Sequence, residues 1–334
     1  MKNHNRLYEF DALRGIAAIS VCLFHFSLFK FGCVGVDLFF IISGFVIFMS
    51  ILNVKSIKEF WLSRFIRLYP SYWLSIAVAV CCGLLFHKSS VVINASNVIG
   101  NITMFQPVFK SAYVSGVYWT LYVEMLFYIT MTILWRCNLL KNIELVILIG
   151  LVCAISINGL YLLYGANPQF THYYILIRSL VPILSHMQFF SAGIIFYLIH
   201  SNGISTKRVL LLLLTLFATA ISHKNSVMIN SFLNVTEHLV CDVVVYITFV
   251  LIIYGWAPIL RLKTLMWFGH ISYPLYLIHT SFGLSFKESL INLNLAASSV
   301  IALLSTVLLS YGITYYYDVP IRRYLKRNQY KIEQ

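Results

Sequence analysis

The chain has 334 residues, of which 60% are hydrophobic and only 10% charged, whereas about a quarter of the residues in soluble domains are charged. This composition excludes a soluble domain and predicts an all-α, polytopic membrane protein. The net charge of +13 does not indicate a nucleic-acid partner, because the basic residues follow the membrane topology predicted below.

Apolar runs of about 20 residues, enough to cross a bilayer, predict ten transmembrane helices. They are expected near residues 11–29, 34–52, 72–87, 116–135, 143–164, 182–200, 208–222, 237–256, 265–286 and 295–317. With the N-terminus inside, most lysines and arginines fall on internal segments, and this bias predicts that both termini are cytoplasmic. Asp11 and Arg14 interrupt the start of the first span, so we expect it to be retained and not cleaved as a signal peptide.

The first span places Asp11, Arg14 and His25 among residues that otherwise suit lipid. A cation at the centre of a membrane helix costs about 2.5–3.5 kcal/mol on insertion scales, so such residues usually face a bundle interior or a water-filled cavity. Arg14 and His25 are about three turns and about 16 Å apart on one helix face. They suit a long ligand whose anionic end lies at Arg14 and whose reacting end lies at His25. The alternative is that Arg14 snorkels to the interface and His25 is a packing residue.

The second span begins with Asp37 near the predicted outer surface. Asp37 can orient a catalytic histidine or accept a substrate hydroxyl, or its carboxylate simply favours the helix N-terminus. Ser43 and Gly44 lie deeper, where small residues allow a close approach between helices. Ser43 is also a candidate substrate contact.

Residues 56–70 predict an amphipathic helix on the cytoplasmic face, ended by Pro70. Arg64 and Arg67 are three positions apart and therefore neighbours on one helix face. Their two guanidinium groups can hold a phosphate bidentately. The alternative is a membrane-surface helix that contacts lipid head groups. Beyond the third span, residues 88–115 form an external segment with a short helix expected around 98–105.

The fourth span opens with Tyr118 and Trp119 at the outer interface, where aromatic residues are favoured, and carries Glu124 deeper. Glu124 has no basic residue within a helical turn, and an unpaired carboxylate inside a span needs a partner on another helix. Counted from the outer helix ends, His25 lies at a similar depth. The alternative is that Glu124 is structural and bonds only to neighbouring tyrosines.

The eighth and ninth spans add Asp242 near the outer surface and His279 in the outer half of its helix, after Pro274, which is expected to kink that helix. His279 is either a substrate contact or a packing histidine. The seven cysteines show no metal-type spacing, so we expect neither a disulfide framework nor a metal.

The tenth helix is expected to end at Asp318 and Pro320 on the cytoplasmic surface. The basic tail that follows, about residues 318–334, either contacts lipid or forms part of the entry for an anionic ligand.

Taken in order, these segments resemble the acyltransferase family 3 membrane proteins, which acylate cell-surface polysaccharides such as O-antigen. The matching pieces are FDALRGIAAISVCLFHF, GVDLFFIISGFVI, FWLSRFIRLYPSYW, YWTLYVEMLFY, ISYPLYLIHTS and the terminal DVP. Two departures are visible: glutamate is usual where Asp318 stands, and the hydrolase-like domain that follows the membrane part in some members is not expected within this chain.

The resemblance implies a single domain over residues 1–334 in the bacterial inner membrane. That domain would move an acetyl group from cytoplasmic acetyl-CoA to a hydroxyl of a cell-surface or lipid-linked glycan on the outer side. We expect catalysis by His25, Glu124 and Asp37, donor binding by Arg14, Arg64 and Arg67, and acceptor contacts from Tyr118, Trp119, Ser43, Asp242 and His279. The expected partners are a coenzyme A thioester, the glycan and membrane lipids, with no nucleic acid and no metal.

Two questions stay open at this point. His25 acts either as a general base on the acceptor hydroxyl or as an acetylated intermediate. The competing function is a secondary transporter or flippase of a glycolipid or small anion, because ionisable residues inside spans also mark transport pathways. Against it, the sequence shows no paired broken helices and no internal repeat.

Overall fold

The computed structural model describes residues 8–86, 94–225 and 227–332, and the regular structure within them is helical throughout. Each of the ten predicted spans overlaps a helix. Seven segments are long and apolar enough to cross a membrane: residues 30–53, 57–85, 116–136, 139–164, 206–223, 235–253 and 295–327. The chain is therefore an all-helical multi-pass membrane protein, while the count of ten crossings and the cytoplasmic termini stay predictions. Residues 1–7 and Lys88, which entered the topology argument, lie outside the described residues.

The other three predicted spans do not satisfy both requirements, sufficient length and apolar composition. Helix α1 (Tyr8–His25) carries Glu9, Asp11 and Arg14 within 18 residues. Helices α8 (Met187–Asn202) and α12 (Lys263–Ile278) are 16 residues long. Charge in the first case and length in the other two separate these helices from the rest.

The helices form two compact units, each assembled from separated parts of the sequence. The first unit consists of residues 1–32, 54–122 and 260–334, and the second of residues 33–53 and 123–259. Besides α1 and α12, the first unit holds α3 (Ile57–Leu85), α4 (Ala95–Ile102), α13 (Ser285–Ser289), α14 (Leu295–Ile313) and α15 (Val319–Ile332). Besides α8, the second holds α2 (Gly35–Asn53), α6 (Ile143–Tyr164), α7 (Pro168–Leu180), α9 (Thr206–His223), α10 (Val227–Asn230) and α11 (Val235–Ile253). Helix α5 (Trp119–Arg136) begins in the first unit and continues in the second.

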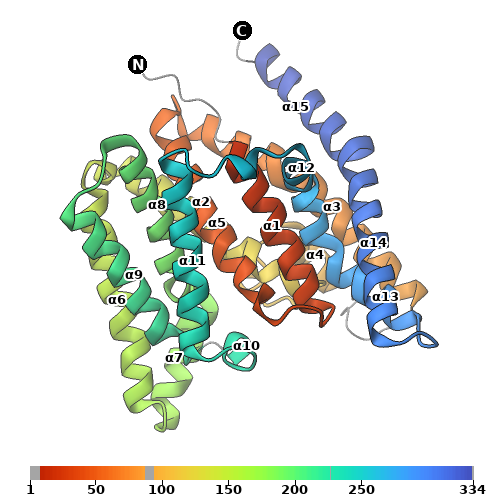
Figure 1. Cartoon of the computed structure of the whole chain (residues 1–334), viewed down its shortest axis with the longest axis horizontal. Coiled ribbons are helices and arrows are strands. Elements are labelled where there is room, and N and C mark those ends of the chain that lie inside the picture. The colour runs from red at the N-terminus through yellow and green to blue at the C-terminus, as the bar shows by residue number, and fades with distance from the viewer. Residues whose placement is uncertain (1–7, 87–93, 226, 333–334) are drawn as a thin grey trace. The chain divides into compact units, whose positions relative to one another are not determined.

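In the first unit, α1 packs along α12 (Figure 1). Two glycines make this contact close. A Cβ added to Gly15 would lie 2.6 Å from the backbone nitrogen of Gly269, and one added to Gly269 would meet the carbonyl of Asp11. Backbone therefore packs on backbone, as at other membrane helix contacts between small residues. This contact holds the helix that carries Arg14 and His25 firmly against α12.

Helix α3 does not end at Pro70, contrary to the sequence expectation, but runs through it from Ile57 to Leu85. The side chains next to the proline anchor this part of the helix to neighbouring segments. The hydroxyls of Tyr69 and Tyr72 donate to the carbonyls of Thr103 and Asn101 at 2.9 and 2.6 Å. A proline inside a membrane helix is tolerated where such tertiary contacts support the surrounding backbone. The amphipathic segment and the third span are thus one helix.

The end of the tenth predicted helix also differs from expectation. A π-helical segment, Thr314–Asp318, follows α14 and leads directly into α15. Pro320 is the second residue of α15, and the first turn of a helix accommodates proline because its N–H groups have no partner within the helix. Asp318 and Pro320 therefore join two helices and do not end the structure. Upstream, the short helix expected at 98–105 is α4, which lies about three residues earlier and is capped by Asn94.

In the second unit, α2 packs on α8 through another pair of glycines. A Cβ added to Gly193 would lie 2.9 Å from the Cα of Gly44, and one added to Gly44 would meet the carbonyl of Phe190. This confirms the prediction that the small residues of the second span allow a close helix approach.

Candidate active site

One cavity in the first unit gathers the three arginines that the sequence assigns to the donor. Arg14 from α1 and Arg64 and Arg67 from α3 line a space of about 370 Å³. The remaining lining residues are Asp11, Ser63, Ile66, Gly269, His270, Ser272, Tyr273, Arg322 and Lys326. Five cationic side chains and one carboxylate thus face a volume within the range of small-molecule sites. This arginine cavity is suited to an anionic ligand.

Local contacts orient the guanidinium groups of the arginine cavity. Nη1 of Arg14 lies 3.1 Å from Oδ1 of Asp11, one turn earlier on α1, and both side chains are less than one-fifth exposed, at 16% and 18%. The guanidinium carbon of Arg64 lies 5.7 Å from the ring centroid of Phe60, a cation–π distance. Guanidinium groups held in place in this way lose less side-chain entropy when they form paired hydrogen bonds to a phosphate.

Two of the cations in the arginine cavity, Arg322 and Lys326, belong to the basic tail. Nη2 of Arg322 lies 2.7 Å from Oδ2 of Asp318. Asp318 also accepts a hydrogen bond from the hydroxyl of Ser71 on α3. These contacts tie the start of α15 to α3 and turn its basic residues toward the cavity. Arg322 and Lys326 thus line the arginine cavity, while the two roles left open for the tail stay predictions.

The predicted catalytic residue His25, at the end of α1, lies beside the ring of His279, with 5.0 Å between ring centroids. His279 is fully buried and opens a π-helical segment, His279–Leu284, that follows α12. Its Nδ1–H donates to the carbonyl of Tyr276 at 2.7 Å. Nε2 is therefore the unprotonated nitrogen, and it has no hydrogen-bond partner among the described residues. A buried acceptor beside His25 is more than a packing contact requires, and single π turns of this kind are frequent at functional sites.

The backbone immediately after His25 is fixed by two side chains. The carbonyl of Phe26 accepts hydrogen bonds from Nζ of Lys287 at 2.8 Å and from the hydroxyl of Ser299 at 2.9 Å. Loss of hydration lowers the pKa of the Lys287 ammonium from its ordinary value. His25 is thus held at a defined position at the end of its helix.

Glu124 lies in the second unit, where it bonds to side chains of two helices. The same carboxylate oxygen, Oε1, accepts from the hydroxyl of Ser43 on α2 at 3.0 Å and from the hydroxyl of Tyr128, one turn later on α5, at 2.6 Å. The predicted acceptor contact Ser43 is therefore a partner of the predicted catalytic carboxylate. His25 and Glu124 belong to different units, and their pairing stays a prediction.

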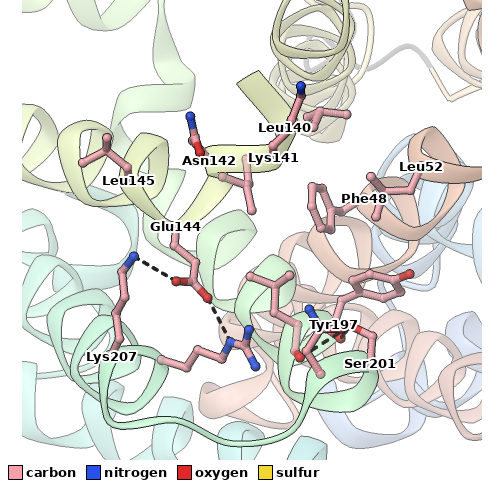
Figure 2. Close-up of a pocket in the computed structure, with 14 residues that line it drawn as sticks. Phe48, Leu52, Leu140, Lys141, Asn142, Glu144, Leu145, Tyr197, Ser201 and Lys207 are labelled. Atoms are coloured by element: carbon pink, nitrogen blue, oxygen red, sulfur yellow. Dashed lines mark hydrogen bonds and ion pairs between the residues drawn. The ribbon is translucent and has the colours of Figure 1, made fainter. Parts of the chain in front are cut away.

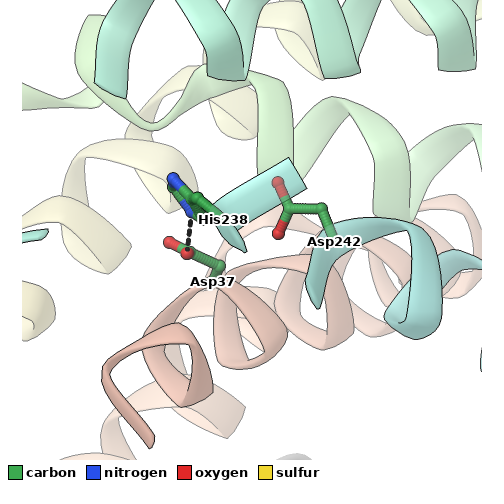
Figure 3. Close-up of side chains that lie close together, drawn as sticks. All are labelled: Asp37, His238 and Asp242. Atoms are coloured by element: carbon green, nitrogen blue, oxygen red, sulfur yellow. Dashed lines mark hydrogen bonds and ion pairs between the residues drawn. The ribbon is translucent and has the colours of Figure 1, made fainter. Parts of the chain in front are cut away.

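Asp37, the third predicted catalytic residue, contacts a histidine that the sequence did not single out. Oδ2 of Asp37 lies 2.9 Å from Nε2 of His238 on α11. Nδ1 of the same ring lies 2.9 Å from Nδ1 of His223. Asp242, one turn after His238, completes a buried group (Figure 3). Asp37 thus orients a histidine, as one of the sequence interpretations proposed, but that histidine is His238.

The two aromatic residues expected at the acceptor site differ in exposure. Tyr118 is fully buried; its hydroxyl shares a hydrogen bond of 2.8 Å with that of Ser75, and its ring meets Tyr72 edge-on with 4.9 Å between centroids. Trp119, the first residue of α5, is half-buried. Of the two, Trp119 is the one that has surface to offer a ligand.

The second unit holds a larger cavity of about 710 Å³ between the ends of α2, α6, α8 and α9 (Figure 2). It also contains cations, but Glu144 contacts two of them: Nζ of Lys207 and Nε of Arg208 each lie 2.9 Å from a carboxylate oxygen. Figure 2 shows the side chain of Lys207 reaching Glu144. No residue that the sequence assigned to the donor or to catalysis lines this space.

Three features of the structure could not be predicted from the sequence, for one reason. His238, the pairing of His25 with His279, and the turn of Arg322 into the arginine cavity all depend on contacts between distant parts of the chain. A charge or histidine in a span is visible in the sequence, but its partner is not. For His238 a signal existed, since it stands one helical turn before Asp242 and so shares a face with it.

Comparison with known proteins now places the chain in a family. Residues 7–315 match the family model of acyltransferase family 3, described as an acyltransferase domain. The chain belongs to acyltransferase family 3. The match covers nearly all of the printed sequence and every segment on which the resemblance was based except the terminal DVP, residues 318–320.

Three curated relatives are similar to this acyltransferase family 3 member, and two of them are named for bacterial polysaccharides. It is 29% identical to the peptidoglycan O-acetyltransferase of Listeria monocytogenes over 49% of this chain and 30% of that protein. It is 25% identical to the ORF330 protein of Acidianus two-tailed virus over 80% of both chains. It is 32% identical to an exopolysaccharide production protein of Rhizobium meliloti over 39% of this chain and 42% of that one. The chain thus spans less than half the length of the first and third of these relatives. No solved structure matches it.

Proposed function

We propose that the chain transfers an acetyl group from cytoplasmic acetyl-CoA to a hydroxyl of a cell-surface or lipid-linked glycan, of the O-antigen type, on the outer side of a bacterial inner membrane. Membership of an acyltransferase family and relatives named as O-acetyltransferases support the reaction class. The observation that carries the donor assignment is the arginine cavity, because Arg14 of α1 and Arg64 and Arg67 of α3 face one space.

The donor site follows from the charge and length of coenzyme A. Its phosphates are multiply anionic and match a cavity with five cationic side chains. Its thioester lies at the end of a long, flexible pantetheine arm. Arg14 and His25 are separated by about 16 Å along α1, so an arm that runs beside this helix brings the thioester to His25. In the larger cavity of the second unit, by contrast, two of the cations contact Glu144.

Transfer requires a base at the thioester. The acceptor oxygen attacks the acetyl carbonyl carbon, its proton passes to His25, the carbon–sulfur bond breaks and coenzyme A leaves as a thiol once protonated. General-base catalysis of this kind contributes about 10²–10⁴-fold. In the alternative route, the imidazole of His25 attacks first and carries the acetyl group to the acceptor.

His279 is placed to assist either route. Its Nε2 has no hydrogen-bond partner among the described residues and is available to accept from the imidazole N–H of His25 during the reaction, because the two ring centroids lie 5.0 Å apart. Such a bond would select the tautomer of His25 and stabilise the imidazolium that forms when His25 takes up a proton. The aspartate of a Ser-His-Asp triad has this role. Glu124, with its bonds to Ser43 and Tyr128, remains the second candidate for this role.

The test is a reconstituted reaction. Protein purified into lipid nanodiscs is supplied with acetyl-CoA and a lipid-linked glycan, and both thiol release and acetylated glycan are measured, the latter by mass spectrometry. We expect thiol release that depends on the glycan and yields one acetylated product per thiol. Transport of the glycolipid in vesicles without acetylation would instead support the flippase alternative, which family membership does not favour.

A further inference from the structure

A buried group in the second unit, Asp37, His238 and Asp242, has the composition of a metal site. Asp37 comes from α2, and His238 and Asp242 lie one turn apart on α11. One ligand atom from each residue lies within 4.8 Å of the others. Figure 3 shows Asp37 in contact with His238 and the carboxylate of Asp242 turned toward this pair. None of them is more than 2% exposed.

The charge of this group is not balanced by its own contacts. Asp37 is bonded to His238 at 2.9 Å. Neither carboxylate oxygen of Asp242 has a hydrogen-bond partner within 3.5 Å among the described residues, although its side chain is fully buried. The hydroxyl of Thr219 lies beside this carboxylate, but it donates to the carbonyl of Thr215 at 3.2 Å. A buried carboxylate is stable only when a positive charge or hydrogen bonds compensate for its lost hydration. One imidazole cannot supply that compensation for two carboxylates.

The surroundings of His238 match those of a metal-bound imidazole. Its Nε2 faces the carboxylates, while its Nδ1 lies 2.9 Å from Nδ1 of His223. Metal-binding histidines almost always donate their other ring N–H to a nearby acceptor, which fixes the tautomer and the orientation of the ring. His223, buried on α9, is placed to be that acceptor.

We propose that Asp37, His238 and Asp242 bind a divalent transition-metal ion, Zn²⁺ or Mn²⁺ in type, through one oxygen of each carboxylate and Nε2 of the imidazole. Two positive charges neutralise the two carboxylates and leave the histidine neutral. A donor set of one nitrogen and two oxygens suits these ions. Metal–ligand bonds of about 2.0–2.2 Å at tetrahedral angles place ligand atoms about 3.3–3.6 Å apart. The ligand atoms, which now lie within 4.8 Å of one another, would therefore have to approach by up to about 1.3 Å on binding. The ion then links α2 to α11, whose ligands Asp37 and His238 are 201 positions apart.

The first measurement is metal content. Full-length protein with a tag that lacks histidine is produced in medium supplied with zinc and manganese, purified, and analysed by inductively coupled plasma mass spectrometry. We expect about one ion per chain in the wild type and a loss of at least about fivefold in Asp242→Asn and His238→Gln. His172→Gln is the matched control, because His172 lies exposed on α7 outside the group; it should retain the ion.

The second measurement is thermal stability, which the wild-type protein alone can provide if the variants do not fold. A chelator should lower the melting temperature of the wild type, and Zn²⁺ or Mn²⁺ should restore it, because the ion binds only the folded state. Asp242→Asn should not respond. Wild-type protein without bound metal and without a response to the chelator would overturn the proposal. So would an Asp242→Asn protein that melts above wild-type protein purified from the metal-supplied medium, because Asp242 would then be an uncompensated carboxylate and not a metal ligand.

Discussion

Removal of Arg14 should weaken coenzyme A binding more than removal of Arg67. Each substitution deletes hydrogen bonds between charged groups, worth about 1.5–3 kcal/mol, which corresponds to about a 10- to 150-fold rise in Kd. Arg14→Gln also removes the cation that lies 3.1 Å from Asp11. The Asp11 carboxylate then faces the phosphates from inside the same cavity.

The size of this additional effect follows from Coulomb's law. Two like charges about 6 Å apart repel by about 2.8 kcal/mol at an effective dielectric constant of about 20. Salt and the solvent that reaches these side chains reduce this to about 1 kcal/mol. Arg14→Gln should therefore raise Kd by about 60- to 700-fold in total. The double variant Asp11→Asn/Arg14→Gln should bind about fivefold more tightly than Arg14→Gln alone.

The assay is isothermal titration of coenzyme A into protein held in lipid nanodiscs. Lys207→Gln is the matched control, because it removes a cation from the cavity of the second unit and should leave Kd within about twofold of wild type. The reasoning fails if Arg14→Gln and Arg67→Gln both bind like wild type. It also fails in part if the double variant binds more weakly than Arg14→Gln, since Asp11 would then contribute to binding and not oppose it.

Three further predictions concern catalysis, packing and sidedness. His25→Ala should lower glycan acetylation by at least about 100-fold while the protein remains in the membrane. Acetylation near the wild-type level in His25→Ala would remove His25 from the mechanism. His279→Ala should lower kcat with little change in coenzyme A affinity. Gly269→Ala should destabilise the protein by about 1–3 kcal/mol because its new methyl group meets the backbone of α1; Gly312→Ala, at a glycine with open space around it, is the control in a thermal unfolding assay, and equal melting temperatures would contradict the packing. In sealed vesicles of known orientation, acetyl-CoA on the cytoplasmic side should support acetylation of a glycan confined to the outer leaflet; a requirement for both substrates on the cytoplasmic side would exclude transfer through the membrane.

The helical class and most helix positions were predictable because hydropathy is a local property, and burial in lipid or protein requires it. Arg14, which lines the arginine cavity, stood out for the opposite reason: it is a charged exception to its apolar surroundings. Its donor role stays a prediction. The two wrong boundaries both involve proline. Local rules end a helix near Pro70 and near Pro320. In the folded chain, tertiary contacts support the helix around Pro70, and a π-helical segment directly precedes the helix that contains Pro320.

Partners across the fold were beyond the reach of the sequence. Nothing near Asp37 in the chain identifies His238, 201 positions away. In the same way, His279 could be predicted as a packing residue or a ligand contact, but only the fold places its ring against that of His25. Residue types that do chemistry can be found from one sequence, whereas their pairings require the three-dimensional arrangement.

The close glycine contact between α1 and α12 gives the proposed donor site a fixed length. Arg14 and His25 lie on one of these helices, and His279 directly follows the other, so backbone packing at Gly15 and Gly269 keeps both ends of the site from sliding. The site then acts as a molecular ruler. It selects donors by the distance from their phosphates to their thioester. Small acyl phosphates are too short to span this distance. Coenzyme A thioesters with acyl chains of different length all have the same distance and are not distinguished by it. Discrimination among acyl groups must therefore come from the space around the two histidines, and not from the arginine end.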